Sequence, residues 1–358
     1  MVREAEVTKP AYRVPSMAEI AAVPWNGYSA ISTFSGCGGS SLGYKMAGFK
    51  VLWANEFIPA AQEVYRANHP DTILDTRDIR MVTPESLLAA IGMVPGQLDL
   101  FDGSPPCASF STAGVREQGW GHVKQYSDTR QRTDDLFFEY ARLVKGIQPK
   151  VFVAENVSGL VKGTAKGYFK EILAALRQCG YNVRAQLLDA QWLGVPQMRQ
   201  RIIFVGVRSD LGLAPAFPTP LAYRYSVRDA LPWIAEISGR TGPQFSRVES
   251  ELDMPMNTIV IQDPAQTRYE LLDQPYTTIQ AGAGARTSSS WAHGTCEHPT
   301  EKRKFSIAEL RRICAFPDDF ILIGTYAQQW ERLGRAVPPV MMEKIASTIR
   351  DEILCKIR

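Results

Sequence analysis

Short apolar runs alternate with helix-like segments through the first 208 residues of the chain. The apolar runs predict strands because they are rich in β-branched and aromatic residues and end at turn formers; they cover residues 28–34, 50–56, 98–103, 150–157, 181–190 and 201–207. Apolar positions at helical spacing predict helices over residues 59–69, 134–147 and 168–180. Strands that alternate with helices predict an α/β protein with an open, doubly wound sheet. Ligands of such sheets bind outside the carboxyl ends of the strands, so unusual residues at those ends are candidates for a site.

The pattern changes after residue 208, where prolines and short extended runs replace the alternation. This change in sequence pattern predicts a second, smaller and irregular domain. Helical periodicity returns afterwards, and residues 341–357 predict an amphipathic helix that packs back on the sheet. We therefore expect a loosely attached extension over residues 1–27, a main domain formed by residues 28–208 and 326–358, and the irregular domain over residues 209–325.

The composition is typical of a soluble intracellular protein. The chain has 358 residues, 45% of them hydrophobic, and a formal net charge of +3, which permits a nucleic-acid partner without requiring one. Six cysteines are scattered without a C-x-x-C pair, which argues against a zinc site or a disulfide framework and favours a reducing compartment. The N-terminus is polar, and no apolar run reaches the ~18 residues that a membrane span needs.

A glycine-rich turn follows the first predicted strand, and an acid ends the second. Gly36, Cys37, Gly38 and Gly39 allow the backbone to approach a ligand and to turn into a helix whose N-terminus favours an anion. Glu56 comes twenty positions after the first glycine, the spacing at which Rossmann-like units place an acid for ribose hydroxyls. The alternative interpretation is a tight turn and a solvated glutamate.

Two further strand ends carry groups suited to covalent chemistry. In "DGSPPCASFS" two prolines fix the backbone ahead of Cys107, which presents its thiol on a rigid turn. A thiol attacks as the thiolate, so Cys107 needs a cationic or dipolar setting; otherwise it is a buried structural cysteine. Glu155 follows an apolar run, where partial desolvation favours its protonated form and makes it a candidate proton donor. The alternative is that Glu155 caps a helix or stabilises a loop by hydrogen bonds.

Two arginines in "QMRQR", Arg199 and Arg201, begin the last of these strands. Residues two apart on an extended segment point to the same side, so the pair could hold a phosphate or a base carbonyl; the alternative is a solvated strand edge. Asp78 in "TRDIR" could accept a hydrogen bond from an adenine amino group, although a lone aspartate is more typical of a protein surface.

In this order, the segments resemble the motifs of the C5-cytosine DNA methyltransferase family. "FSGCGGSSLGYKMAGF" is similar to the cofactor loop of that family, "NEF" to its ribose-binding acid, "DIR" to its adenine-binding turn and "PPCASFS" to its nucleophile motif. "ENV" resembles the general-acid motif, "QMRQR" the arginine motif and, except at one position, "GRAVPP" the last motif. "DDLFFEYARLV" and "RRICAFPDDF" also fit, and the resemblance runs from about residue 28 to the C-terminus apart from the variable middle.

The resemblance implies a Rossmann-like, S-adenosylmethionine-dependent methyltransferase that modifies C5 of a cytosine rotated out of double-stranded DNA. It implies catalytic roles for Cys107, Glu155, Arg199 and Arg201. The residues implied to bind the cofactor are Phe34, Gly36, Cys37, Gly38, Gly39, Glu56, Phe57, Asp78, Ile79, Ser104, Pro106, Leu136, Arg335, Ala336 and Val337. The residues implied to contact DNA are Ser111, Arg116, Arg224 and Arg228.

The resemblance also implies the roles of whole segments. Residues 209–325 would recognise the target sequence, and residues 112–133 would form a mobile lid over the extruded nucleotide. No metal is implied. We expect a monomer in the cytoplasm of a bacterial or phage-infected cell.

Two positions depart from the family pattern. Ala108 follows the nucleophile where the family usually has Gln, and Arg335 stands where the last motif usually has Asn, close in the family fold to the reacting end of a cationic sulfonium. A guanidinium about 5 Å from that sulfonium would cost roughly 3 kcal/mol at an effective dielectric of ~20 before screening. Either Arg335 pairs with a protein acid or a DNA phosphate, or cofactor binding is weak, or the donor carries an anion. Carboxy-S-adenosylmethionine is such a donor, and its product would be 5-carboxymethylcytosine.

Two other functions fit the same scaffold. One is a tRNA cytosine-5 methyltransferase, against which the large middle region and the long lid favour DNA. The other is a non-catalytic DNA-binding regulator, against which the presence of Cys107, Glu155 and Arg199 argues.

Overall fold

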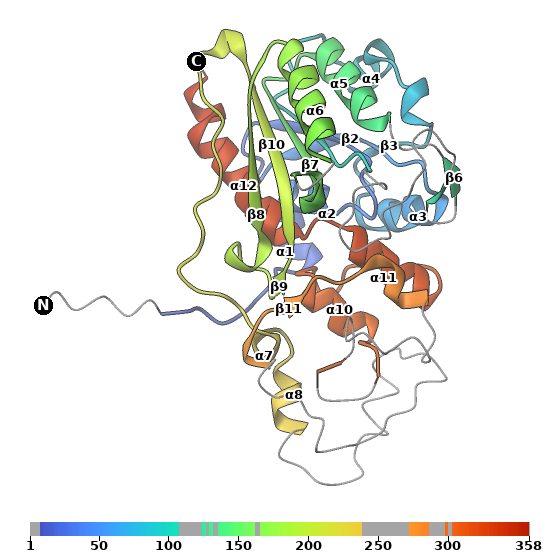
Figure 1. Ribbon diagram of the computed structural model, residues 1–358, viewed down its shortest axis with the longest axis vertical. Helices are drawn as coiled ribbons and strands as arrows, with labels where there is room; N and C mark the ends of the chain where they lie inside the picture. The colour runs from blue at the N-terminus through green and yellow to red at the C-terminus, as the bar shows by residue number, and fades with distance from the viewer. Residues whose placement is uncertain are drawn as a thin grey trace, which may run out of the picture. The chain divides into compact units, whose positions relative to one another are not determined.

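A seven-stranded sheet forms the centre of the larger part of the protein (Figure 1). The computed structural model describes residues 8–106, 124–126, 129–131, 135–161, 165–237, 272–285, 298–299 and 303–357. In spatial order the strands are β3 (Ile73–Asp75), β2 (Lys50–Asn55), β1 (Ser29–Thr33), β4 (Leu100–Gly103), β7 (Val151–Val157), β10 (Gln200–Arg208) and β8 (Tyr181–Asp189). The strands from β3 to β7 pair in parallel, and β10 is antiparallel to β7. The predicted α/β, Rossmann-like sheet is confirmed, and the reversal of β10 against β7 is a feature that the sequence did not predict.

Helices connect these strands, and most of the predicted segments are helical. The helices in chain order are α1 (Met17–Ala21), α2 (Gly39–Met46), α3 (Pro59–Asn68), α4 (Pro84–Ile91), α5 (Leu136–Ile147), α6 (Lys166–Gln178) and α12 (Pro339–Glu352). Short 3-10 turns occur at η1 (Ile79–Met81), η2 (Ser158–Val161), η4 (Ala190–Trp192), η5 (Ser209–Leu211) and η10 (Leu354–Lys356). A two-stranded ribbon of β5 (Lys124–Tyr126) and β6 (Thr129–Gln131) lies in the segment predicted to be a lid.

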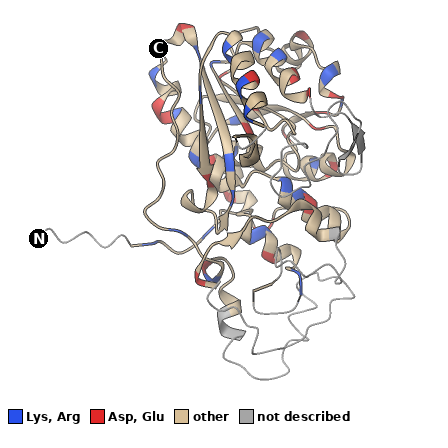
Figure 2. Cartoon of the chain, in the orientation of Figure 1, with Lys and Arg blue, Asp and Glu red and all other residues tan. Residues whose placement is uncertain are grey.

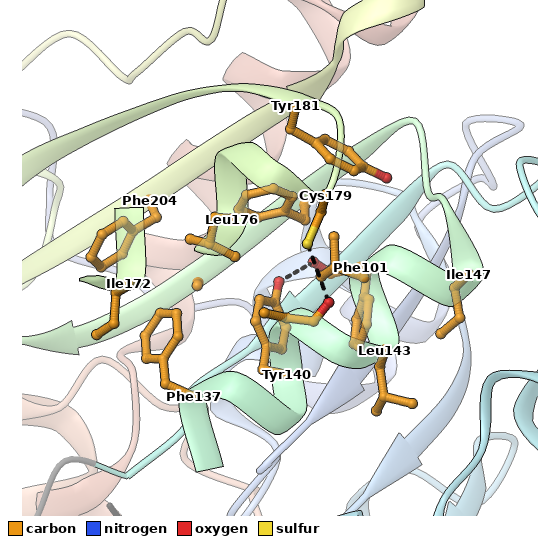
Figure 3. Close-up of a cluster of buried hydrophobic side chains, with 14 of the residues drawn as sticks. Phe101, Phe137, Tyr140, Leu143, Ile147, Ile172, Leu176, Cys179, Tyr181 and Phe204 are labelled. Carbon is orange, nitrogen blue, oxygen red and sulfur yellow. Dashed lines mark hydrogen bonds between the residues drawn. The ribbon is translucent and has the colours of Figure 1, made fainter. Parts of the chain in front are cut away.

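Helices α4, α5 and α6 pack on the sheet through a common hydrophobic core. Figure 3 shows the part of this core that side chains of α5, α6 and the strands form. Phe101, Tyr140, Phe152 and Phe204 are each fully buried there. The Tyr140 hydroxyl lies 3.1 Å from the Phe101 carbonyl oxygen and 2.9 Å from that of Val153, which ties α5 to β4 and β7. The core therefore fixes the two central strands whose ends carry the candidate catalytic groups.

The chain folds into two compact units. The larger unit, which holds the main sheet, comprises Ala18–Leu188, Gln200–Pro218 and Met342–Arg358. The smaller unit comprises Met1–Met17, Asp189–Arg199 and Thr219–Met341. Residues 189–199 and 326–341, which the sequence assigned to the main domain, thus group with the smaller unit. In the first segment β9 (Gln197–Met198) pairs with β11 (Tyr276–Thr277), and in the second Trp330 Nε1 donates to the Gln280 carbonyl oxygen. The three-part division drawn from the sequence stays a prediction.

The smaller unit is organised around short helices and a buried ion pair. Its helices are α7 (Val227–Ala230), α8 (Pro232–Ile237), α10 (Ile307–Ile313) and α11 (Tyr326–Arg335), with a 3-10 turn η8 (Ala281–Ala285). Glu309 of α10 is fully buried and accepts two 2.8 Å hydrogen bonds from the Arg303 guanidinium, which satisfies both charges. The N-terminal segment, expected to be loosely attached, makes specific contacts in this unit: Lys9 Nζ lies 2.7 Å from Asp229 Oδ2, and Tyr12 donates to the Arg312 carbonyl oxygen.

Charged side chains of both signs are interspersed along α12 (Figure 2). Glu343 pairs there with Lys344 and Arg350 pairs with Asp351. In the part of the chain that the structure describes, no helix is long and apolar enough to cross a membrane. No cluster of three or more His, Cys, Asp or Glu suited to a metal ion occurs among the same residues.

Candidate active site

The carboxyl ends of the parallel strands bring several of the predicted site residues to one edge of the sheet. The strand order reverses between β1 and β4, and such a reversal is where doubly wound sheets bind their ligands. The loop after β1, Glu56 after β2, Ser104 after β4 and Glu155 on β7 all stand at this edge. The register supports this placement because Gly103, the last residue of β4, pairs with Ala154, the neighbour of Glu155.

The glycine-rich loop after β1 has a special backbone. Phe34 adopts a φ of 55°, which is uncommon for a residue with a side chain, and Gly38 has a φ of 93°. Glu56 fixes the loop: its Oε2 accepts a 2.7 Å hydrogen bond from the Gly36 N–H, and its Oε1 accepts one of the same length from the Ile58 N–H. The loop and the acid predicted from their spacing are thus parts of one hydrogen-bonded unit.

His69, which the sequence analysis did not identify, packs against this loop at Gly38. His69, which follows α3, is 1% exposed and stacks on Tyr65 with ring centroids 4.5 Å apart. A Cβ at Gly38 would lie 2.2 Å from His69 Nε2, so only glycine fits above the ring. Burial lowers the pKa of His69 well below its ordinary value, and Lys45 adds to that shift, so the ring is neutral.

The adenine-binding turn proposed from "DIR" is a capped 3-10 turn. The Asp78 carboxylate accepts a hydrogen bond from the Arg80 N–H and pairs with the Arg80 guanidinium at 3.0 Å. Arg80 also pairs with Asp135, at 2.6 Å. Ile79 and Leu136, both predicted to touch the cofactor, are buried members of the aromatic core.

Two hydrogen bonds hold the segment before Cys107, the predicted nucleophile. Cys107 itself lies outside the described residues, but Ser104, Pro105 and Pro106 before it are described. The Ser104 N–H donates to the Thr33 carbonyl oxygen at 3.2 Å, and Asn156 Nδ2 donates to the Pro105 carbonyl oxygen at 3.2 Å. Asn156, the middle residue of "ENV", thus fixes the Pro105 backbone, a contact that the sequence analysis did not predict.

Glu155 and Arg201 form a partly buried ion pair beside this segment. Arg201 Nε lies 2.7 Å from Glu155 Oε1, and the two side chains are 12% and 11% exposed. Arg201 faces Val157 in the antiparallel pairing of β10 with β7, which places Glu155 diagonally across the ladder. Burial lowers the pKa of the Arg201 guanidinium, while Glu155 opposes that shift and keeps the charge in place.

Arg199 has different partners from Arg201. It is 2% exposed, and its guanidinium donates to the carbonyl oxygens of Gly334 at 3.0 Å and Arg335 at 3.3 Å. These are the last residues of α11, whose orphan carbonyls need donors. Arg199 thus caps the end of α11, whereas Arg201 pairs with Glu155.

Substitution of Arg199 by Lys is expected to destabilise the protein by about 2 kcal/mol, because one ammonium cannot serve two carbonyls in the planar geometry of a guanidinium. Urea unfolding measures this change. A large fall in kcat at unchanged stability would contradict it and indicate a direct role in catalysis.

The side chain of Arg335 pairs with an acid of its own helix. Arg335 Nε lies 2.7 Å from Glu331 Oε1, one turn earlier on α11. Gly334 beside it packs against η8, where a Cβ would lie 2.7 Å from Ala281 Cα. Ala336 and Val337 continue from the end of the helix, and Val337 is buried. In this structure Arg335 thus meets a protein carboxylate.

The residues predicted to contact DNA fall into two groups. Ser111 and Arg116 lie outside the described residues, as do most residues of the predicted lid. Arg224 stacks over the Trp192 ring at 4.9 Å and donates to Gln191 Oε1 at 3.0 Å. Arg228 forms an exposed ion pair with Asp273, at 2.7 Å.

The loop after β1 fits the nucleoside part of S-adenosylmethionine. A Cβ at Gly36 would meet no atom within 4 Å, so this side of the loop is open, which a closely approaching ligand requires. A carboxylate accepts as many as about four hydrogen bonds, so an acid such as Glu56, which already accepts from two backbone N–H groups, is also suited to ribose hydroxyls. Phe57 follows directly and is half-buried.

The fold and this loop are those of an S-adenosylmethionine-dependent methyltransferase. Within that class, the chain belongs to the family of C-5 cytosine-specific DNA methylases, whose family model matches residues 28–351. The resemblance stated from the motifs is thereby confirmed, and the protein is a DNA cytosine-5 methyltransferase.

Curated relatives match over nearly their whole length. The chain is 29% identical over 345 residues to the type II methyltransferase M.NgoPII of Neisseria gonorrhoeae, covering 91% of this chain and 96% of the relative. It is 31% identical over 339 residues to the type II methyltransferase M.MthTI of Methanothermobacter thermautotrophicus, covering 90% and 97%.

Solved structures share the fold at lower identity. A protein described as a DNA modification methyltransferase encoded within a prophage of E. coli aligns with a TM-score of 0.66 and 21% identity, covering 92% of this chain and 100% of that one. The S. pombe Dnmt2 methyltransferase aligns with a TM-score of 0.58 and 17% identity, covering 90% and 98%.

Proposed function

We propose that the protein alkylates C5 of cytosine in double-stranded DNA through a covalent bond between Cys107 and a base rotated out of the helix. The observation that carries this proposal is the Glu155–Arg201 pair on β7 and β10, next to a nucleophile segment that Asn156 holds in place. A carboxyl group and a guanidinium side by side match the ring nitrogen and carbonyl oxygen of a cytosine.

Each of these residues has a distinct role in the proposed reaction. C5 of cytosine is a weak nucleophile, and addition of the Cys107 thiolate to C6 makes C5 electron-rich. Glu155 binds N3 of the ring and supplies a proton there as the thiolate adds, while Arg201 holds the neighbouring carbonyl oxygen. After the alkyl group is on C5, loss of the C5 proton to a base returns its electron pair to the ring, restores the C5–C6 double bond and expels the thiolate.

Phe34, the loop from Gly36 to Gly39, Glu56 and Asp78 would hold S-adenosylmethionine. When bound, this cofactor supplies an electrophilic carbon on a sulfonium sulfur that leaves as a neutral thioether. The Glu56 carboxylate orients the ribose, and the open side of Gly36 lets the backbone approach the ligand. The half-buried carboxylate of Asp78 would accept from the adenine amino group.

A second candidate reaction is the transfer of a carboxymethyl group from carboxy-S-adenosylmethionine, to give 5-carboxymethylcytosine. The pairing of Arg335 with Glu331 agrees with the alternative in which this arginine meets a protein acid. Glu331 also pairs with Arg332, at 2.9 Å, so the cluster of three side chains carries one more positive charge than negative. A donor that brings a carboxylate would give the Arg335 guanidinium a further anionic partner.

The relatives support a proposal for the biological setting. Type II methyltransferases are the curated proteins that the chain matches, and we propose that it likewise modifies a short DNA target in the cytoplasm of a bacterial or phage-infected cell, as a monomer, in restriction-modification. Residues 209–325 would read the target sequence, and residues 112–133 would close over the base.

The test of the proposed function is mass spectrometry of nucleosides from duplex DNA treated with the enzyme and each donor separately. We expect 5-methylcytosine from the plain donor, 5-carboxymethylcytosine from the carboxy donor, and neither with Cys107→Ser. A covalent complex with DNA containing 5-fluorocytosine is expected for the wild type alone, because the fluorine cannot leave as a proton does. Undiminished alkylation by Cys107→Ser would overturn the proposal, and equal modification of tRNA would overturn the assignment to DNA.

A further inference from the structure

Arg80 links the turn that carries Asp78 to Asp135, the residue before α5. Its Nε and Nη2 donate to the two carboxylate oxygens of Asp135 at 3.0 and 2.6 Å, the two-bond geometry that holds a guanidinium most firmly. Its Nη1 lies 3.0 Å from Asp78 Oδ2 and 3.2 Å from Asp78 Oδ1. Asp135 therefore fixes the plane of the guanidinium, and the guanidinium in turn fixes the carboxylate of Asp78.

The segment that leads into this turn is tied to the end of β2. Asn55, the last residue of β2, is 2% exposed, and its Nδ2 donates to the carbonyl oxygens of Asp75 at 3.1 Å and Arg77 at 2.9 Å. The N–H of Glu56, which follows Asn55, donates to the Asp75 carbonyl oxygen at 3.1 Å. The chain that leads to Asp78 therefore runs next to Glu56, at the edge of the sheet that carries the candidate site.

The far end of the turn is held by α5. Arg142 Nη2 donates to the carbonyl oxygens of Ile79 at 3.2 Å and Val82 at 2.9 Å. The Asp78 carboxylate also accepts from the backbone N–H of Arg80, a bond that remains when only the side chain of Arg80 is changed. Removal of that side chain therefore leaves the backbone of the turn supported at both ends. What it removes is a restraint on the orientation of the Asp78 carboxylate.

We propose that Arg80 is a positioning residue for cofactor recognition: held by Asp135, it orients the Asp78 carboxylate to accept from the amino group of the adenine. This inference rests on the proposed function, in which Asp78 accepts from that group. The side chain of Asp78 is 30% exposed, which leaves surface for a ligand to contact. A carboxylate accepts as many as about four hydrogen bonds, so an aspartate that accepts from Arg80 is also suited to an amino donor.

The expected consequence is a preference for ligands that carry the amino group. An analogue with hydrogen in place of the adenine amino group cannot form this hydrogen bond to a charged acceptor. We expect the wild type to bind S-adenosylhomocysteine, the thioether that the donor becomes, about thirtyfold more tightly than the same compound without the amino group, equivalent to about 2 kcal/mol. Without Arg80 the preference should fall to about fivefold, because ligand binding must then order the Asp78 side chain.

Isothermal titration of the full-length protein with the two ligands, in the absence of DNA, measures this preference as the ratio of two dissociation constants. The proteins compared are the wild type, Arg80→Ala, Asp78→Ala and the double variant. We expect a ratio of about thirty for the wild type, about five for Arg80→Ala and about one for Asp78→Ala, with no further change in the double variant. A purely structural role of Arg80 would weaken the binding of both ligands equally and leave the ratio unchanged.

Arg77→Ala is the matched control. Arg77 lies in the same segment and, like Arg80, pairs with the aspartate two residues earlier, with its Nη2 2.5 Å from Asp75 Oδ2. Its substitution removes a guanidinium of the same kind from a neighbouring carboxylate, and the ratio of the wild type should remain. If Arg80→Ala fails to fold, Arg80→Lys replaces it, because one ammonium cannot hold two carboxylates in the planar geometry of a guanidinium, and a smaller fall in the ratio is expected.

The outcomes separate the role of Arg80 from the proposed function. A wild-type ratio in Arg80→Ala, together with its loss in Asp78→Ala, would overturn the role of Arg80 while the contact of Asp78 with the adenine stands. A wild type that binds both ligands equally, or an Asp78→Ala variant with the wild-type ratio, would overturn that contact and the role of Arg80 with it. Because no DNA is present, these ratios do not depend on attack by Cys107, and a failure of the proposed alkylation appears only in the nucleosides of treated DNA.

Discussion

Substitution of Arg201 by Ala is expected to lower kcat about a thousandfold, because a preorganised charged donor to the reacting base is lost. The same change leaves Glu155 without its 2.7 Å partner in a site where both side chains are nearly buried, and we expect a loss of stability of about 3 kcal/mol. Single-turnover alkylation of duplex DNA measures the first effect, and urea unfolding measures the second.

The conservative variant Arg201→Lys separates the two effects. Its ammonium keeps the charge beside Glu155, so most of the stability should return, but it lacks the planar fork that holds a base carbonyl and an acid together. We expect kcat to stay about a hundredfold below the wild type. Arg208→Lys is the control at the other end of β10, where Arg208 pairs with Asp210; it should leave kcat unchanged. A kcat within twofold of the wild type for Arg201→Ala would contradict the role assigned to this pair.

The sequence predicted the central strands and the edge at which the site stands, for physical reasons. Buried parallel strands read as continuous apolar runs, and β1, β2, β4 and β7 each begin and end within about two residues of the predicted runs. The glycine turn and Glu56 were found because a close backbone approach and a ribose-binding acid need those residue types at those places. β3 and α4 were not predicted, since three partly exposed residues and a short helix give little periodicity.

The different surroundings of Arg199 and Arg201 could not be predicted from their spacing. The rule that residues two apart share a side holds within one strand, but β10 begins at Gln200, after Arg199, and the chain passes there between the two compact units. His69 and Asn156 were missed because their roles depend on contacts with Gly38 and Pro105, which are far away in the sequence. The partner of Arg335 could have been found, since Glu331 lies four residues earlier on a helix, the spacing of a favourable pair.

Asp102 is a further residue that the sequence alone could have flagged, as an acid inside the apolar run "LDLFDG". It stands on β4 opposite Ser32 of β1 and is 1% exposed. Its carboxyl group accepts hydrogen bonds from Ser32 Oγ at 2.8 Å and from the Tyr44 hydroxyl at 3.1 Å. Burial raises the pKa of Asp102 to about 7, the two hydrogen bonds oppose that rise, and the charge of Glu155 adds to it.

Substitution of Asp102 by Asn is expected to stabilise the protein at alkaline pH and to remove part of its pH dependence. The folded state raises the pKa of Asp102 from its usual 3.8 to about 7, so the protonated carboxyl group stabilises the fold. This stabilisation is complete below pH 3.8 and is lost as the pH rises through about 7. Between pH 5.5 and pH 8.5 the free energy of unfolding of the wild type should therefore fall by about 2 kcal/mol. The Asp102→Asn variant should not show this fall, because its amide does not titrate. Urea unfolding of both proteins at the two pH values measures the difference.

The size of this effect follows from the nature of the side chains that donate to Asp102 in the described part of the chain, which are two neutral hydroxyl groups. An ionised carboxylate at 1% exposure is costly with hydroxyl donors alone, whereas an amide can accept from one hydroxyl and donate to the other. Asp210→Asn is the control, because that carboxylate is 60% exposed and paired with Arg208, and its change should stay within about 0.5 kcal/mol at both pH values. Equal stability differences between Asp102→Asn and the wild type at pH 5.5 and pH 8.5 would show that Asp102 does not titrate in this range.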